Sequence, residues 1–157
     1  MPLIPDKAAF QNSLASLPIV TYQPGETVIV AGSKTERLLI LKTGAVAVVK
    51  DDTEIAHVAE PGAVFGELSV LLDQPHTADV RALEASQFHI ANATAFLTQN
   101  PVAVLYVATV LAHWLDGANR ALIQIKHQLQ SGEPHSVVVK TVSKIEGFLH
   151  VGGAALI

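Results

Sequence analysis

One stretch of the chain decides its fold: Phe65-Gly66-Glu67-Leu68-Ser69-Val70-Leu71-Leu72-Asp73-Gln74-Pro75-His76-Thr77-Ala78-Asp79-Val80. From Gly66 to Asp73 the apolar residues have helical spacing, inside a region that otherwise has the pattern of β-strands. A glycine lets the backbone approach a ligand closely, and a helix that begins there points unpaired N–H groups outward, which favours an anion. Glu67 adds a carboxylate that suits a sugar hydroxyl and also complements the positive end of a helix. These residues alone fit a small phosphate site and an ordinary helix start equally well.

The sequence around this stretch, from Ile19 to about Ala91, consists of short β-branched runs. Turn residues separate these runs, and glycine supplies backbone angles there that other residues resist. This pattern predicts antiparallel strands in a sandwich or barrel. The predicted strands are Thr27 to Ala31, Leu38 to Leu41, Ala45 to Val49, Ile55 to Ala59, Ala78 to Leu83 and Gln87 to Ala91.

Helical spacing returns at both ends of this region. A short amphipathic helix is predicted within Asp6 to Leu17. After Asn92 the pattern predicts one long helix or two consecutive ones to about Gln130, with Asn100-Pro101 as an N-cap followed by proline at the first helical position. Residues at alternating spacings of three and four form one apolar seam on this helix. The seam consists of Leu115, Ala118, Leu122, Ile125 and Leu129.

Glycine and proline in Ser131-Gly132-Glu133-Pro134 end this helix. From His135 to Ile157 the spacing of apolar residues predicts another helix, although Val137 to Val139 also suit a strand. We therefore expect a sensor-sized domain at residues 1–131 and a C-terminal tail at residues 132–157.

The composition excludes several classes of function. The chain has 157 residues, of which 50% are hydrophobic, enough for one well-buried core. Its net charge is −4, and its 10 Lys and Arg residues are scattered singly, so we expect no direct nucleic-acid binding. It has no cysteine, which excludes disulfides, thiolate catalysis, thiol-based redox sensing and cysteine-bound metals.

The N-terminal residues lack a basic segment followed by an apolar run, so we expect no secretion signal and a cytoplasmic protein. The most apolar stretch, Val102 to Leu115, is shorter than the roughly 20 residues needed to span a bilayer. It also contains Tyr106, Thr109 and His113. We therefore expect a buried helix there and no membrane partner.

The stretch quoted first resembles the phosphate-binding cassette of the cyclic-nucleotide-binding domain family. The family pattern is Phe-Gly-Glu-(Leu or Met)-(Ala or Ser), then, after a spacer, Pro-Arg-x-Ala-(Thr or Ser)-Val. Phe65 to Ser69 and Pro75 to Val80 carry the match, and the turn glycines and flanking helices extend it to roughly residues 6–130. The resemblance implies a mainly β fold with flanking helices: a double-stranded β-roll, or jelly roll, with an N-terminal helix, a short cassette helix and a long C-terminal helix.

The resemblance also implies a function. The chain would be a regulatory, ligand-sensing module without catalytic residues, cofactor or metal, which binds a cyclic nucleotide (cAMP or cGMP) or a related small anion. Glu67 would bind the ribose 2′-hydroxyl, and the helix at about Ala118 to Leu129 would close over the base and transmit the signal. The implied ligand-binding residues are Gly66, Glu67, Leu68, Ser69, His76, Thr77 and Ala78.

His76 departs from the family pattern, which has arginine at this position. Arginine is always charged and offers a bidentate fork, whereas a histidine with a pKa near 6.5 is only about one-quarter protonated at pH 7. Asp79, where the family usually has Thr or Ser, adds a negative charge if it faces the pocket. Three interpretations stand: His76 still binds phosphate in its protonated form, it serves a different ligand, or it is structural in a pocket that has lost its ligand.

Alternatives come from three other classes of protein. Cupin metalloenzymes are also small β-rolls, but none of the histidines forms a His-x-His pair. A haem sensor would use His76 or His113 as an axial ligand. The runner-up is a ligand-free interaction or dimerisation module, in which the seam joins a homodimer.

Transcription regulators of the catabolite activator type share the sensor domain but add a winged helix-turn-helix. Ser131 to Ile157 is too short for that fold. We therefore expect a stand-alone sensor, one whose output domain lies on another polypeptide, or one whose output domain lies outside this sequence.

Overall fold

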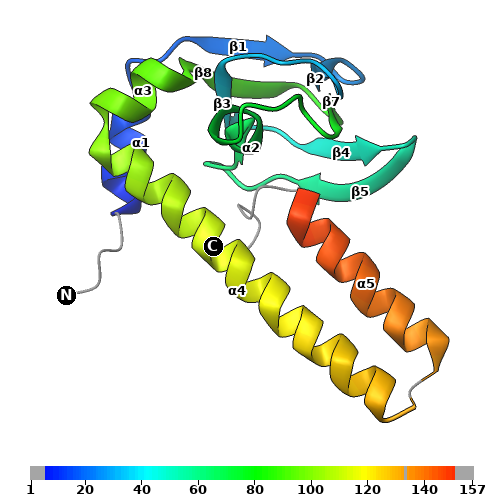
Figure 1. The fold of residues 1–157 in the computed structure, drawn as a ribbon. Helices are drawn as coiled ribbons and strands as arrows, with labels where there is room; N and C mark the ends of the chain where they lie inside the picture. Colours follow the sequence, from blue (N-terminus) through cyan, green and yellow to red (C-terminus); the bar gives the residue numbers. More distant parts are fainter. Residues whose placement is uncertain (1–5, 133, 151–157) are drawn as a thin grey trace.

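The structure of the chain, a computed structural model, describes residues 6–132 and 134–150. It consists of a β-roll from which two helices project (Figure 1). Its elements in chain order are α1 (Lys7–Leu14), β1 (Ile19–Tyr22), β2 (Thr27–Ile29), β3 (Arg37–Thr43), β4 (Val46–Lys50), β5 (Thr53–Val58), β6 (Val64–Phe65), α2 (Glu67–Leu71), β7 (Asp79–Ala82), β8 (Ser86–Asn92), α3 (Ala93–Gln99), α4 (Pro101–Gln130) and α5 (His135–His150).

The roll consists of two four-stranded sheets with strand orders β1-β8-β3-β6 and β2-β7-β4-β5. All the paired strands are antiparallel. One apolar cluster draws residues from both sheets and fills the space between them, with Phe88, Val46 and Val48 fully buried. The predicted double-stranded β-roll with flanking helices is confirmed.

Strand β3 is buried on both faces. Leu39 and Leu41 contact the cluster between the sheets, whereas Leu38 and Ile40 contact a second cluster beneath the helices. Successive side chains of a strand point to opposite faces, so an unbroken apolar run is what such a position requires.

The helices pack on the outer face of β3 through the second cluster. Phe10 of α1 stacks on Tyr106 of α4 with ring centroids 3.7 Å apart, and the Tyr106 hydroxyl donates a hydrogen bond to the Gly62 carbonyl at 3.3 Å. Val110, one turn further along α4, is also buried in this cluster. The first half of α4 is thereby anchored to the roll.

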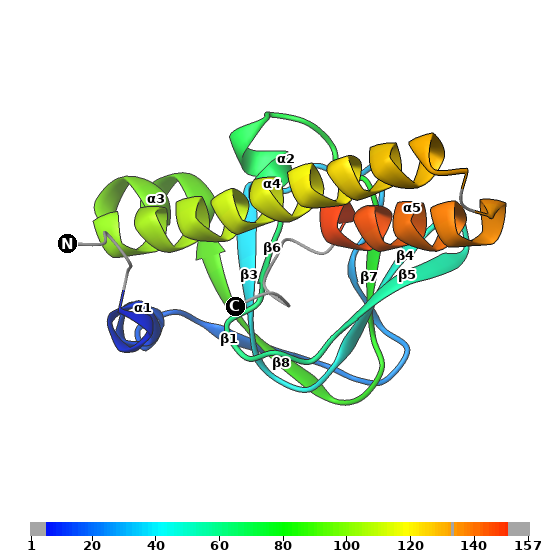
Figure 2. The ribbon, with the colours of Figure 1, turned by 90° about the horizontal axis from the view of Figure 1, so that it is seen from below.

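The second half of α4 forms a helical hairpin with α5. The Asn100 side chain accepts a hydrogen bond from the Ala103 N–H at 3.1 Å and caps the start of α4. After the end of α4, α5 runs back beside it in both views (Figures 1 and 2), and Thr141 donates a hydrogen bond to the Gln128 side chain at 3.1 Å. The far end of α5 contacts β5. The predicted tail helix is confirmed for residues 135–150, so the alternative of a strand at Val137 to Val139 is wrong.

Some predicted boundaries need correction. The sequence pattern missed β1, whose residues are largely exposed, and β6, which has only two residues. The cassette helix is Glu67–Leu71 rather than Gly66 to Asp73, and the strand expected to end at Ala31 ends at Ile29. Residues 151–157, the last part of the predicted tail helix, lie outside the described residues.

Helix α4 is long and apolar enough, by length and composition, to cross a membrane, with a mean hydropathy of 1.3 over its most apolar window. The segment named in the sequence analysis, Val102 to Leu115, is only part of this helix. Only 28% of the most apolar window is buried, so the expected buried helix is exposed over much of its surface. Core helices of soluble proteins have the same length and composition, and α4 is anchored on the roll through Ala103, Tyr106 and Val110. The absence of a membrane partner stays a prediction.

Candidate ligand-binding site

The structure gathers all seven implied ligand-binding residues around one cavity of about 60 Å³. They lie at the N-cap of α2, on α2 and in the loop between α2 and β7. We call the segment from β6 to β7, residues 64–82, the cassette. Ile29 of β2 and Val48 of β4 form the apolar floor of the cavity. A local sequence motif has therefore been folded into a single concave site.

Gly66 begins the cassette helix with a backbone angle that favours glycine. Its φ is +93°, in the left-handed region, and a Cβ atom there would lie 2.7 Å from the Arg37 carbonyl oxygen. The strand β3 and the cassette thus touch through backbone atoms, which fixes where α2 begins.

Glu67 is the most deeply buried acidic group of the site, with 4% of its surface exposed. Burial raises the pKa of this carboxyl from 4.5 to about 7, and a hydrogen bond with its own backbone N–H opposes the rise. Near pH 7 the carboxyl therefore exists in both forms. It accepts a hydrogen bond from a ligand hydroxyl when ionised and donates one when protonated.

Ser69 closes the loop of the cassette instead of presenting a free hydroxyl. Its Oγ donates a hydrogen bond to the Gln74 carbonyl, and the Gln74 N–H donates to the Ser69 carbonyl at 3.0 Å. Thr77, by contrast, is exposed at the cavity, and Ala78 is buried. Ser69 therefore shapes the site, and Thr77 offers it a hydroxyl.

His76 is held on three sides. Its backbone N–H donates to the Ser33 carbonyl at 2.9 Å, and its carbonyl accepts from the Gly32 N–H at 2.8 Å. The ring Nε2 lies 3.1 Å from the Thr35 hydroxyl. Only 8% of the residue is exposed, and this burial lowers the pKa of the imidazole below 6.5. Burial therefore favours the neutral form of the ring.

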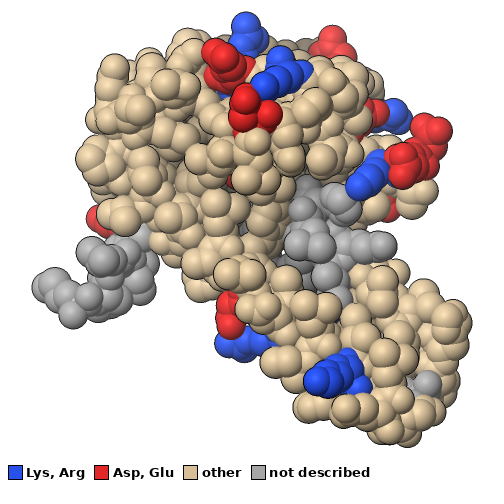
Figure 3. All heavy atoms as spheres, in the orientation of Figure 1, with Lys and Arg blue, Asp and Glu red and all other residues tan. Residues whose placement is uncertain are grey.

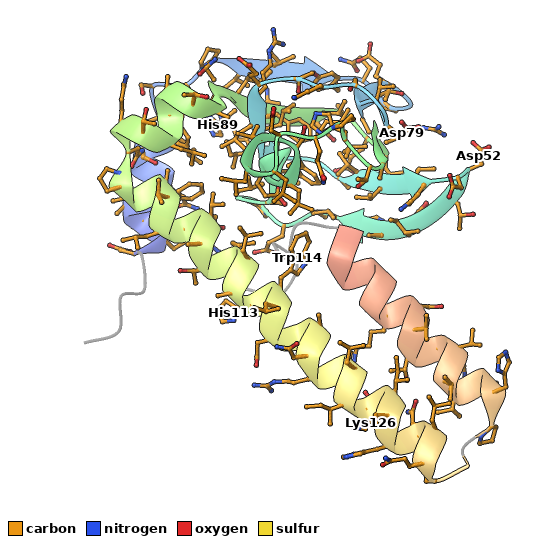
Figure 4. The ribbon with its side chains drawn as sticks, viewed as in Figure 1. Asp52, Asp79, His89, His113, Trp114 and Lys126 are labelled. Carbon is orange, nitrogen blue, oxygen red and sulfur yellow. The ribbon has the colours of Figure 1, made fainter. Side chains whose placement is uncertain are left out.

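Asp79 does not line the cavity. Its carboxylate accepts a hydrogen bond from the Ala31 N–H at 2.7 Å and forms an ion pair with Arg81 at 3.0 Å, at the edge of the roll (Figure 4). The hydrogen bond from Ala31, and then Arg81, lower the pKa of this carboxyl. The possibility that Asp79 adds a negative charge to the pocket is therefore wrong, because its carboxylate is paired with the Ala31 N–H and with Arg81 outside the cavity.

Helix α4 does not cover the cavity in the described structure. None of the cavity-lining residues belongs to α4 or α5. The predicted lid at Ala118 to Leu129 lies instead in the part of α4 that projects from the roll (Figure 1). Leu115, Leu122 and Leu129 of the seam are 64%, 57% and 65% exposed, so the seam does not pack on the roll.

The surface of the hairpin contrasts with that of the roll. Lys, Arg, Asp and Glu gather over the strands, and the visible face of the hairpin carries few of them (Figure 3). Trp114 lies on the side of α4 that faces the roll (Figure 4) and is buried, without a hydrogen-bond partner for its Nε1 among the described residues.

The histidines do not converge. His89 lies on β8 and His113 on α4, far apart in Figure 4. Within residues 6–132 and 134–150, no group of three or more His, Asp or Glu side chains has a geometry that could hold a metal ion. The arrangement gives the cupin hypothesis no support.

Sequence analysis missed Thr35 as the partner of His76 and Ala31 as the partner of Asp79. The two contacts join residues 41 and 48 positions apart, and neither Thr35 nor Ala31 belongs to the motif. No signal in the sequence points to them.

Comparison with known proteins agrees with this geometry. Residues 19–99 match the family described as "Cyclic nucleotide-binding domain". The chain is 40% identical to a cGMP-dependent protein kinase of Plasmodium berghei (strain Anka) over 68 residues, which cover 43% of this chain and 8% of that kinase. The chain thus spans only a small part of the length of this curated relative.

Two solved structures resemble the chain in fold. The catabolite activator protein of Thermus thermophilus has a TM-score of 0.60 and 17% identity, with 93% of this chain and 81% of that chain covered. A cyclic nucleotide-binding domain from Methylobacillus flagellatus KT has a TM-score of 0.61 and 20% identity, with 76% and 74% covered. At these identities the two likenesses show the fold alone.

Proposed function

We propose, since the chain belongs to the cyclic nucleotide-binding domain family, that it is a regulatory module which senses a ribose-bearing ligand in the cassette cavity. The family is a regulatory one, and its cyclic nucleotides, cAMP and cGMP, are the first ligands to test. The observation that carries the proposal is the convergence of Gly66, Glu67, His76 and Thr77 on one cavity.

Glu67 would recognise the sugar. A buried carboxyl whose pKa lies near 7 needs a polar partner, because an unpaired polar group in a buried site is costly. A ribose hydroxyl both donates and accepts hydrogen bonds, so it satisfies either form of Glu67.

The ligand would have to widen the cavity. Pockets for small ligands usually measure about 300–1,000 Å³, whereas this one measures about 60 Å³. A ligand that fits only when the cassette has moved outward binds this open arrangement better than the closed one. Such a difference in affinity shifts the equilibrium between the two conformations.

The movement would reach the hairpin through α2 and α3. Val70 of α2 packs against the second apolar cluster, as do Phe96 and Leu97 of α3 and Tyr106 of α4. Displacement of α2 would therefore alter the apolar cluster against which α4 packs. In this proposal residues 1–131 sense the ligand and residues 132–157, which include α5, belong to the output surface.

Titration of the chain with cAMP, cGMP and the corresponding nucleosides, monitored by calorimetry and by fluorescence of Trp114, tests the proposal. Trp114 is the only tryptophan and lies on α4, outside the cavity, so a saturable change in its fluorescence reports transmission. Glu67→Ala should weaken binding at least about tenfold. Glu54→Ala, an exposed change on β5, is the matched control. If none of these ribose ligands binds, the sensor function is wrong.

We propose a second copy of this chain as the partner that binds the exposed seam of the hairpin. Leu115, Leu122 and Leu129 recur every seven residues on the exposed side of α4, with Ala118 and Ile125 half-buried beside them. A seven-residue apolar repeat is the pattern of two helices that pack along a shared seam. A homodimer with two-fold symmetry would place this repeat against itself and cover it.

A further inference from the structure

We propose that the cassette cavity selects an uncharged nucleoside over a cyclic nucleotide, because no permanent positive charge faces it to balance a phosphate. This inference rests on the proposed sensor function and names its ligand class. It is carried by the charges that line the cavity and by the partners of the nearest cations.

The cavity is lined by apolar and neutral polar residues, with Glu67 as its only acidic side chain and no Lys or Arg among the described lining residues. His76 occupies the place of the arginine in the family pattern. A buried anion without a paired cation is strongly disfavoured. A cyclic nucleotide carries such an anion at neutral pH, whereas a nucleoside carries none.

Among the described residues, two of the three basic side chains in or beside the cassette are paired with acidic groups, and none of the three lines the cavity. Lys34 forms an ion pair with Asp73 and donates a hydrogen bond to its carbonyl at 3.3 Å. Arg81 is bound to Asp79 at the outer edge of the roll. Arg37 touches Gly66 only through its carbonyl and is an exposed residue outside the cavity lining. A phosphate in the cavity would have to detach Lys34 or Arg81 from its acidic partner, or draw the exposed side chain of Arg37 into the cavity.

His76 is set up as a neutral hydrogen-bonding group. Its Nε2 lies 3.1 Å from the Thr35 hydroxyl, and burial lowers the pKa of the ring, which disfavours the charged form that a phosphate would need. The other ring nitrogen then takes the complementary role of donor or acceptor. A neutral imidazole suits a hydroxyl better than a phosphate oxygen.

The polar groups at the cavity match the hydroxyls of a nucleoside. Glu67, His76 and Thr77 offer a carboxyl, an imidazole and a hydroxyl within one small space. A free nucleoside has hydroxyls at the 2′, 3′ and 5′ positions, whereas the ring of a 3′,5′-cyclic nucleotide removes two of them. When Glu67 is ionised, its charge also repels the cyclic phosphate.

The experiment is calorimetric titration of the full chain at pH 7.5 with adenosine and guanosine, each compared with its 3′,5′-cyclic monophosphate. We expect one nucleoside to bind at least about tenfold more tightly than its cyclic nucleotide. A factor of about ten is the low end of what one hydrogen bond to a charged group contributes. The 2′-deoxynucleoside should lose affinity, because Glu67 then has no hydroxyl to bind.

His76→Arg should reverse the order of affinities, since it restores a permanent charge and a bidentate fork at the cavity. His57→Arg adds the same charge at an exposed position on β5 and should leave the order unchanged. Circular dichroism shows whether both variants fold like the natural chain. Arg37→Ala should also leave the order unchanged.

Tighter binding of the cyclic nucleotide by the natural chain would overturn the inference and leave the sensor function standing. Loss of that binding in Arg37→Ala would identify Arg37 as the phosphate partner and also overturn it. Binding of cyclic nucleotide by His76→Arg, with no ligand bound by the natural chain, would overturn both the inference and the sensor function, since the site of the natural chain would then bind no ligand. If neither the natural chain nor His76→Arg binds any of the four compounds, the sensor function fails together with the inference.

Discussion

The cassette and the helical hairpin are stabilised in opposite ways. The cassette is fixed by partly buried polar contacts, such as those of Ser69 with Gln74 and of His76 with Thr35. The hairpin is joined to the roll through the aromatic stack on the first half of α4 and through the contact of α5 with β5. Its outer half leaves Leu122 and Leu129 in contact with solvent. The difference teaches that ligand selectivity depends on single polar residues in the cassette, whereas the hairpin depends on an apolar area that a partner can cover.

Phe10→Ala should have the largest effect, because it removes the anchor of the hairpin. Phe10 is 1% exposed and stacks on Tyr106, and the loss of a buried phenyl group costs about 3–5 kcal/mol. Urea unfolding measures the change in the free energy of unfolding. Leu72→Ala, an exposed position in the cassette, is the control and should cost under about 0.5 kcal/mol. Equal costs for both changes would refute the anchoring role of the stack.

The same substitution, glycine to alanine, should have opposite signs in the two regions. Gly66→Ala should destabilise by about 2–4 kcal/mol, because φ is positive and the new Cβ meets the Arg37 carbonyl. Gly117→Ala on α4, with nothing within 4 Å of the new Cβ, should stabilise by about 0.5–1 kcal/mol. Thermal and urea unfolding of both variants check this, and a neutral Gly66→Ala would contradict the close approach of β3 and the cassette.

Glu67→Gln should gain stability relative to the natural chain as pH rises. The folded-state pKa of Glu67, about 7, lies above its ordinary value of 4.5, so the folded state binds more protons between these values. The contribution of Glu67 therefore falls as pH rises from about 4.5 to 7, by about 1–3 kcal/mol. The lowered pKa of His76 acts in the opposite sense below pH 6.5, and both proteins share it.

Urea unfolding of Glu67→Gln and the natural chain at pH 5, 6, 7 and 8 measures this difference. Glu54→Gln, an exposed change, should give a flat difference across the same range. A flat difference for Glu67→Gln as well would show that Glu67 is hydrated in solution.

Leu122→Glu should have the smallest effect on the fold and change only the assembly. Leu122 is 57% exposed, so the monomer should lose under about 0.5 kcal/mol. A charge in the middle of an apolar seam should nevertheless separate a dimer. Analytical ultracentrifugation of the natural chain and of Leu122→Glu measures this, with Leu72→Glu, at the exposed C-cap of α2, as the control. A monomeric natural chain would contradict the proposed dimer.

The sequence predicts the local features of this molecule well. The motif brings all its ligand-binding residues to one cavity because they lie within a single short segment, from Gly66 to Ala78. The unbroken apolar run Leu38 to Leu41 also predicts a strand, and it is one because both of its faces are buried. In both cases the determining residues are neighbours in the chain.

Features that depend on distant residues could not be predicted. The compensation of Asp79 requires the backbone N–H of Ala31, which any residue except proline supplies and which therefore leaves no mark in the sequence. The three valines from Val137 to Val139 favour a strand by propensity, yet they lie in a helix because α4 offers a face to pack on. Tertiary contacts decided both outcomes.

The continuity of α4 has a mechanical consequence. From Tyr106, where the helix is anchored, to Gln130 it is one uninterrupted rod. At 1.5 Å per residue this rod is about 36 Å long, so a tilt of about 10° at the anchor moves its tip by roughly 6 Å. A small rotation at the anchor would therefore displace the far end of α4 by about the rise of one helical turn.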